Sequence, residues 1–122
     1  MANPFVWVEL HTADAEKAKK FYTDLFGWKL QQMGDMPYTL ILGDQGGVGG
    51  ISAQPTQANP KAHWLTYVGV PNLDTATKKA KSLGATVKEE NIPIPGAGRF
   101  SIIIDPTGAE VALWENAQHS AH

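Results

Sequence analysis

The 122-residue sequence contains no cysteine. This absence excludes disulfides, thiolate nucleophiles, zinc–thiolate sites and iron–sulfur clusters, and it fits a reducing compartment, so we expect a cytoplasmic protein. A long apolar run is also missing, because no stretch approaches the roughly 18 apolar residues of a membrane span. The first ten residues lack the charged and apolar regions of a signal peptide. We therefore expect no membrane partner.

Charge of one sign is scarce as well. Ten Lys and Arg residues face twelve Asp and Glu residues, for a formal net charge of −2, and both kinds are spread along the chain. Binding to a phosphate backbone needs clustered cations, so we expect no nucleic-acid partner. The length and the 43% of hydrophobic residues instead predict one compact domain over residues 1–122.

The sequence contains an internal repeat. A β-rich strand at 5–10 and an amphipathic helix at 15–26 are followed by a strand at 64–70 and a helix at 75–83. Asp14 is the expected N-cap of the first helix, and Asn72 or Asp74 of the second. Gly27 and Gly84 are expected to end these helices. Asp14 and Asn72 are 58 positions apart, so the helices occupy matching places.

The repeat continues after the helices. Residues 38–51 and 100–113 both read as strand, glycine-containing turn and strand, and they align at a shift of 62. The extra residues of the second half are expected in a loop at 91–98. The prediction is an α+β fold of two βαβββ modules, 4–55 and 61–116, in which curved mixed sheets carry helices outside and line a shared cleft.

The segments FYTDLFGW and DPTGAEVAL, together with the paired modules, resemble the vicinal oxygen chelate superfamily of glyoxalases, bleomycin-resistance proteins and extradiol dioxygenases. The resemblance covers residues 5–115. WVEL, WxxY and GxGR look most like small bacterial glyoxalase-like proteins. The resemblance implies a homodimer, with each cleft built from the modules of one chain or from modules exchanged between two chains.

The resemblance also implies four positions for the ligands of a divalent metal ion. In this sequence they are occupied by Trp7, Gly50, Leu65 and Ala112. None of these side chains supplies the nitrogen or oxygen donor that such an ion needs, so we expect neither a metal nor another cofactor. A shifted site is the less favoured alternative, because strand neighbours two residues apart are about 7 Å apart. It would use Glu9, His11, His63 and Glu110.

Period two places side chains of several strands on the free face of the sheet. The residues expected to bind a ligand are Trp7, Glu9, His11, Ser52, His63, Tyr67, Arg99, Phe100 and Trp114. Aromatic faces and a few charged groups suit a small aromatic or amphiphilic molecule, which the chain would bind in a metal-free cleft. Glu9 is the strongest member, because an acid between apolar residues is costly to bury without a partner.

Other interpretations stay open. The chain is alternatively a lyase, isomerase or epimerase that uses Glu9 or His11 as a general base near Tyr67 as an acid. A third interpretation is a dimeric interaction module with a vestigial cleft. Several of the predicted site residues also have a purely structural interpretation. His63 would be a solvated residue at the strand edge, and His11 would form a hydrogen bond with the backbone. Trp7 and Trp114 would pack at a dimer contact.

Overall fold

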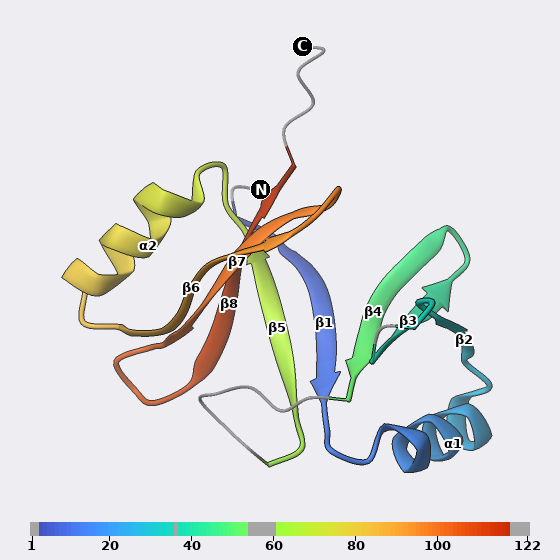
Figure 1. Ribbon diagram of the computed structural model, residues 1–122. Helices are drawn as coiled ribbons and strands as arrows, with labels where there is room; N and C mark the ends of the chain where they lie inside the picture. Colours follow the sequence, from blue (N-terminus) through green and yellow to red (C-terminus); the bar gives the residue numbers. More distant parts are fainter. Residues whose placement is uncertain (1–2, 36, 54–60, 118–122) are drawn as a thin grey trace. The chain divides into compact units, whose positions relative to one another are not determined.

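A computed structural model describes residues 3–35, 37–53 and 61–117 (Figure 1). Within these ranges the chain forms two helices and eight strands. In chain order they are β1 (Phe5–His11), α1 (Ala15–Phe26), β2 (Lys29–Gln32), β3 (Tyr38–Gly43), β4 (Gly46–Ser52), β5 (His63–Gly69), α2 (Leu73–Ser82), β6 (Thr86–Ile94), β7 (Gly98–Ile104) and β8 (Glu110–Asn116). Neither helix is long and apolar enough to cross a membrane.

The fold is α+β, and its elements repeat as βαβββ followed by βαβββ, as the sequence predicts. Contacts divide the chain into two compact units. We call Trp7–Leu65 the α1 unit, and Met1–Val6 with Thr66–His122 the α2 unit. Strands β1 and β5 each begin in one unit and continue in the other.

In the α1 unit the strand order is β2-β3-β4-β1, with β1 parallel to β4 and the other pairs antiparallel. The side chain of Asp14 accepts from the backbone N–H of Lys17 at 3.1 Å and caps α1, as predicted. Gly27 ends the helix in the left-handed conformation, with φ 71°. The core consists of Leu10, Ile41 and Ile51, against which residues of α1 and β2 pack.

In the α2 unit the order is β5-β8-β7-β6, with β5 parallel to β8. Asn72 caps α2, which selects one of the two predicted caps. The backbone N–H of Leu73 also donates to Glu115 on β8, at 2.6 Å. Leu73 and Thr77 are buried, and the Thr77 hydroxyl lies 3.1 Å from that of Ser101. Helix α2 is therefore fixed to its sheet by polar and apolar contacts.

Two predictions about these elements need correction. The loop expected at 91–98 is strand up to Ile94, and register shifts in the β6–β7 pair absorb the extra residues. Pro93 is compatible with β6 because this strand ends the sheet order and needs no donor on its outer side. The helix at 15–26 is predicted to be amphipathic, but not all of its apolar residues face the core. Tyr22 packs against the core, whereas Phe21 and Leu25 are more than half exposed.

Candidate functional site

The side chains of β1 alternate between the two faces of the α1-unit sheet. Leu10 packs in the core beneath α1, so the neighbouring Glu9 and His11 lie on the opposite, helix-free face. Both are nearly buried, each with 8% of its surface exposed. The register of β1 and β4 places Ser52 beside His11. The sequence prediction that these three residues lie close together in the fold agrees with this arrangement.

A chain of contacts joins five side chains on this face, which we call the polar network. The indole Nε1–H of Trp7 donates to the Tyr38 hydroxyl at 2.9 Å, and that hydroxyl is hydrogen-bonded to Glu9. Glu9 Oε1 lies 2.8 Å from His11 Nε2. The imidazole of His11 stacks on that of His63, with ring centroids 5.7 Å apart and planes inclined by 18°. Residues distant in sequence thus form one hydrogen-bonded and stacked group.

The tautomer of His63 follows from its backbone contact. Its Nδ1 lies 2.7 Å from the carbonyl oxygen of Lys61. A carbonyl oxygen only accepts hydrogen bonds, so Nδ1 carries the proton and donates. This hydrogen bond fixes the plane of the His63 ring, which stacks on His11. The backbone just before β5 thereby helps to position the network.

The environment of Tyr38 determines the protonation of its phenol. Burial raises the pKa of the Tyr38 phenol far above its usual range, the negative charge of Glu9 raises it further, and the hydrogen bond to Glu9 adds to both. Donation from Trp7 acts in the opposite direction. The phenol is therefore neutral at physiological pH. It accepts from Trp7 and donates to the Glu9 carboxylate.

The helix-free positions of the α2 unit carry aromatic side chains instead. The ring of Tyr67 lies 5.8 Å from that of Phe100 and 6.3 Å from that of Trp114, in both cases nearly edge to face. Trp114 donates through Nε1 to the Asn116 side chain at 2.7 Å. It also lines a shallow depression of about 410 Å³ with residues including Pro4 and Pro71. We call Tyr67, Phe100 and Trp114 the aromatic cluster.

Arg99 does not join the aromatic cluster. Its guanidinium lies 3.0 Å from Glu115, 2.8 Å from the Asn91 side chain and 3.4 Å from Asp74 on α2. These contacts place it on the helix side of the sheet, and period two explains why it lies opposite its neighbour Phe100. The prediction that Arg99 orients a ligand finds no support in these contacts, which hold α2 to β7 and β8.

Val48 lies on the opposite face of the sheet from Gly50, although strand alternation would place residues 48 and 50 on one face. It lines a groove with Trp28 and Trp64, on the side of the sheet where Trp28 packs against the core. The register of β3 and β4 shifts between Ile41 and Leu42. Such an irregularity breaks the alternation of side chains and moves Val48 to the other face.

Comparisons with known proteins agree with this architecture. A family model for the bleomycin resistance protein-like N-terminal region matches residues 4–43. The protein CFP32 of Mycobacterium tuberculosis, whose name assigns it provisionally to the glyoxylases, is 38% identical over 120 residues, which are 93% of this chain and 46% of that protein. These similarities support the vicinal oxygen chelate superfamily that the sequence resembles.

Two further proteins show the range of similarity. The anthracycline biosynthesis protein DnrV of Streptomyces peucetius is 27% identical over 88% of this chain and 45% of its own length. Homoprotocatechuate 2,3-dioxygenase of Brevibacterium fuscum, solved with 3,4-dihydroxyphenylacetate, has the same fold, with a TM-score of 0.69, 16% identity, and coverage of 97% of this chain and 38% of the dioxygenase chain. This chain spans about half the length of the curated relatives it matches.

The superfamily implies a metal ion, and the residues at the corresponding positions of this chain do not fit one. Trp7, Leu65 and Ala112 offer no suitable donor. At Gly50 a Cβ atom would overlap the hydroxyl of Tyr38, so the space that a ligand side chain would need is already filled. Among the residues that the structure describes, no three His, Asp or Glu side chains are placed to hold an ion. The alternative metal site would use four residues. Glu9, His11 and His63 lie in the polar network, and Glu110 belongs to the α2 unit.

Tyr38 is the site residue that the sequence prediction missed. The internal repeat aligns residue 38 with residue 100, and Phe100 was predicted to bind a ligand. Carrying that prediction back through the repeat identifies Tyr38. The same alignment could not have shown its hydrogen bonds, because they depend on Glu9 and on the missing side chain at Gly50.

Proposed function

We propose that the chain binds a small aromatic or amphiphilic molecule on the polar network of the α1 unit, without a metal ion. The observation that supports this most directly is the phenol of Tyr38 above Gly50, which fills the place of a metal-ligand side chain while leaving a carboxylate and two imidazoles nearby. A cytoplasmic location, expected from the absence of cysteine, is part of the same proposal.

The polar network offers complementary groups to such a molecule. The Glu9 carboxylate accepts hydrogen bonds, and Tyr38 and His11 restrict its orientation from two sides. The faces of Trp7 and the stacked imidazoles suit a flat ring. Held in this way, Glu9 loses little conformational entropy when a ligand arrives, so its hydrogen bond contributes more to affinity than that of a mobile acid.

The aromatic cluster contributes a second ligand-binding surface to the proposal. Tyr67 is almost completely buried, and Phe100 and Trp114 are partly exposed beside it. Edge-to-face packing fixes all three rings. A rigid aromatic surface of this kind binds apolar parts of a ligand without ordering its own side chains.

A second candidate function is proton transfer. It is favoured by the 2.8 Å approach of Glu9 to His11, both of which are nearly buried. Carboxylate and imidazole at this distance form the pair that a general base and its orienting group require. In this version Glu9 or His11 removes a proton next to a carbonyl of the bound molecule. The phenol that contacts Glu9 is Tyr38, whereas the Tyr67 expected from the sequence belongs to the α2 unit.

The names of the relatives supply the first probes: bleomycin, an anthracycline and 3,4-dihydroxyphenylacetate. Thermal unfolding of the purified chain with each compound measures binding, because a ligand of the native state raises the melting temperature. We expect at least one probe to do so, and Glu9→Gln to weaken its binding about tenfold or more, in keeping with a hydrogen bond to a charged group. Glu16→Gln is the matched control, since the Glu16 side chain is 87% exposed on α1.

The outcomes separate the candidates. Binding without turnover supports the binder, and turnover that Glu9→Gln abolishes supports the enzyme. Equal binding by wild type and Glu9→Gln would remove the polar network from the proposal. One tightly held transition-metal ion per chain, found by elemental analysis after purification without chelator, would overturn its metal-free part.

A further inference from the structure

A groove of the α1 unit lies outside the proposed ligand site. It has a volume of about 500 Å³, and its apolar lining includes Val8, Trp28, Val48 and Trp64. Val8 lies on the same face of β1 as Leu10, whose side chain packs in the core beneath α1. The polar network occupies the opposite, helix-free face. The groove is therefore a separate cavity, and it has the volume of a small-molecule site.

The two indoles that line the groove are held at right angles. The ring centroids of Trp28 and Trp64 are 6.4 Å apart, with planes inclined by 90°. Tyr22 contacts both rings: it stacks on Trp28 at 5.3 Å and meets Trp64 edge to face at 5.5 Å. Trp64 still has 39% of its surface exposed. Indoles that are fixed and partly exposed can bind a ligand without a further loss of side-chain entropy.

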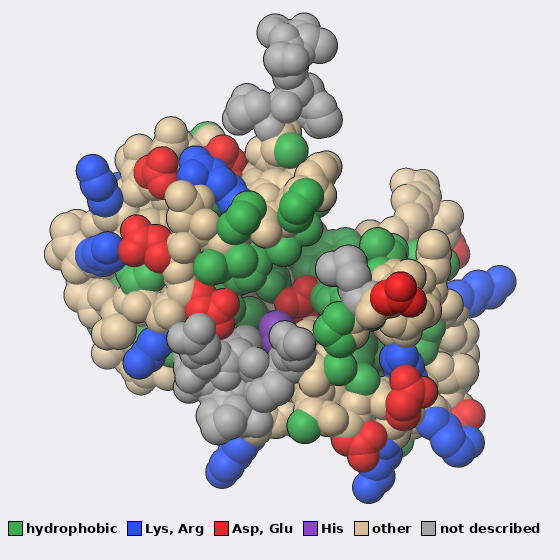
Figure 2. Space-filling model, in the orientation of Figure 1, with side chains coloured by type: hydrophobic (Ala, Val, Ile, Leu, Met, Phe, Trp, Pro, Cys, Tyr) green, Lys and Arg blue, Asp and Glu red, His purple; other side chains and the backbone are tan. Residues whose placement is uncertain are grey.

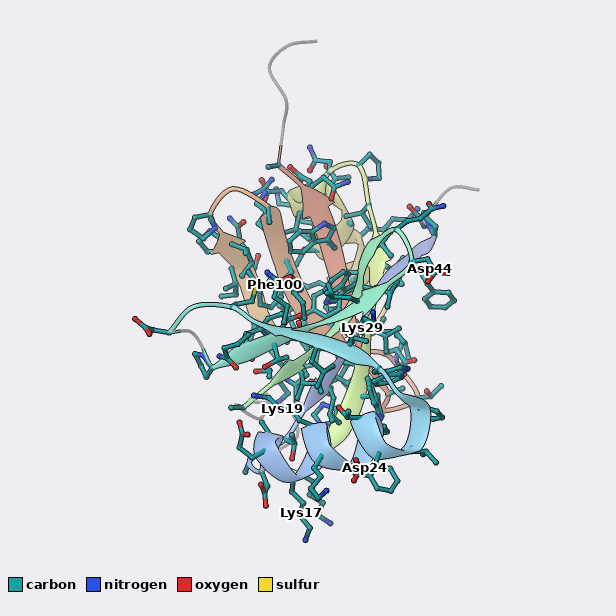
Figure 3. All side chains as sticks on the ribbon, turned by 90° about the vertical axis from the view of Figure 1, so that its right-hand side faces the viewer. Lys17, Lys19, Asp24, Lys29, Asp44 and Phe100 are labelled. Carbon is teal, nitrogen blue, oxygen red and sulfur yellow. The ribbon has the colours of Figure 1, made fainter. Side chains whose placement is uncertain are left out.

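Asp44 is the only charged residue among the described residues that line the groove. It lies in the turn between β3 and β4, away from Lys17 and Lys19 on α1 (Figure 3). Lys29 is the next cation along the chain, but Leu30 packs against the core, so strand alternation places Lys29 on the other face. An acid in a hairpin turn is common by itself. Together with two exposed indoles, it makes the groove favourable for a positive charge.

An organic cation without N–H groups matches this combination. The faces of aromatic rings attract positive charge, and Trp does so more strongly than Tyr or Phe. The carboxylate of Asp44 adds the attraction of an opposite charge. Side chains of Val and Trp offer no hydrogen-bond acceptor, so a primary ammonium group would lose its hydrogen bonds to water there. A methylated ammonium group has no such bonds to lose, and its methyl groups suit an apolar lining.

We propose that the groove binds a small quaternary ammonium compound, with the positive charge between Trp28 and Trp64 and with Asp44 as its counter-ion. The compound is a free small molecule, because the groove is formed within one unit and has the volume of a small-molecule site. This site shares no residue with the polar network. The proposal therefore stands or fails separately from the proposed function.

Proton NMR titration with choline tests the proposal. A methyl group over the face of an indole is shielded by the ring current, so the N-methyl signal of choline should move upfield when the protein is added. The uncharged isostere 3,3-dimethylbutanol has the shape of choline without its charge, and we expect it to bind about tenfold more weakly. An isostere that binds as tightly as choline, or an N-methyl signal that does not move, would overturn the proposal.

Two substitutions separate the effect of charge from that of apolar contact. Trp64→Leu keeps an apolar side chain but removes the indole face, and Asp44→Asn removes the counter-ion with little change of size. We expect them to weaken choline binding about tenfold and about threefold, and to leave binding of the isostere nearly unchanged. The matched controls are Phe21→Leu and Asp35→Asn, at exposed positions of the same unit that do not line the groove. Both should bind choline as the wild type does.

Far-ultraviolet circular dichroism verifies that each variant is folded. Choline binding that survives both Trp64→Leu and Asp44→Asn, or that the controls weaken equally, would overturn the assignment to the groove. Binding to phosphatidylcholine vesicles without binding of free choline would overturn it in favour of a lipid surface. Loss of choline binding in the two groove variants, with an unchanged response to the probes of the polar network, would support a separate site.

Discussion

The two modules place different chemistry on equivalent backbone. In the α1 unit, Glu9 pairs with Gly50 across β1 and β4. In the α2 unit, Tyr67 pairs with Ala112 across β5 and β8. The first pair belongs to a hydrogen-bonded network in which no methyl group fits at residue 50, and the second to an aromatic cluster beside a fully buried methyl group. The same backbone arrangement thus holds hydrogen-bonded polar side chains in one half and packed aromatic side chains in the other.

The helices of the modules are attached differently as well. The start of α1 is capped locally, by Asp14 three residues before the donor Lys17. The start of α2 is capped by Asn72 and also held by Glu115, which Arg99 orients from the neighbouring strand. The helix with local support is also the one that exposes apolar side chains. The helix that has fewer contacts with distant residues at its start is therefore the one with more exposed apolar side chains.

The largest effect is expected where the modules differ by one methyl group. Gly50→Ala would force a Cβ atom into the Tyr38 phenol, and we expect it to lower the free energy of unfolding by about 3 kcal/mol. The reciprocal change, Ala112→Gly, removes a buried methyl group and should cost about 1 kcal/mol. Urea denaturation measures both. If Gly50→Ala costs no more than Ala112→Gly, the phenol does not occupy the space above residue 50.

A smaller effect is expected from the Tyr38 hydroxyl. Tyr38→Phe removes a hydrogen bond to a carboxylate and one from an indole, so we expect a loss of about 2 kcal/mol. Tyr22→Phe is the control, because Tyr22 makes its contacts through its ring, against Trp28 and Trp64. It should change stability by less than about 0.5 kcal/mol. Equal losses in the two variants would mean that the polar network does not depend on this hydroxyl.

The same phenol predicts the response to alkali. Its pKa is raised in the folded state above the ordinary value of 10.0, so it stabilises the fold below that pH. This contribution is lost as the pH rises further, because the unfolded chain releases the proton first. We expect ultraviolet absorbance to show at least one tyrosine that titrates only as the protein unfolds. If every tyrosine titrates near its ordinary pKa with the fold intact, the burial of Tyr38 is contradicted.

The smallest effect concerns the attachment of α2. The backbone N–H of Leu73 lowers the pKa of Glu115, with a further contribution from Arg99. A carboxylate with a lowered pKa stabilises the fold above its unfolded pKa and loses this contribution as the pH falls. The stability difference between wild type and Glu115→Gln should therefore shrink toward acid pH. Denaturation at neutral and acid pH measures it, and a constant difference would argue against an ionised Glu115.

The sequence predicted the repeat, the caps and the alternation of β1, because each depends on local pattern. Asp14, Asn72 and Gly27 each lie next to the helix end that they define. Glu9 and His11 could be assigned to one face because strand alternation is unbroken there. These features use information contained in a few consecutive residues.

The remaining features depend on partners distant in sequence. Val48 changes face because the register between β3 and β4 shifts at Val48 itself. Pro93 is tolerated because β6 is the last strand in the order of the described sheet. Tyr38 acquires its role from Trp7, 31 positions away, and Arg99 from contacts with Asp74 and Glu115. None of these pairings leaves a pattern in consecutive residues.

The distribution of charge was more predictable. Acidic and basic side chains are interspersed over the visible face (Figure 2), in keeping with the balanced composition.

The hydrogen bond between Leu73 and Glu115 spans 42 positions and has a consequence for synthesis. The ribosome produces the acceptor of the α1 cap three residues before its donor, so α1 can form as soon as its own residues emerge. The first N–H of α2 receives its carboxylate only when β8 is nearly complete. We expect the α1 unit to fold during translation while α2 stays loosely attached until the end of the chain is available.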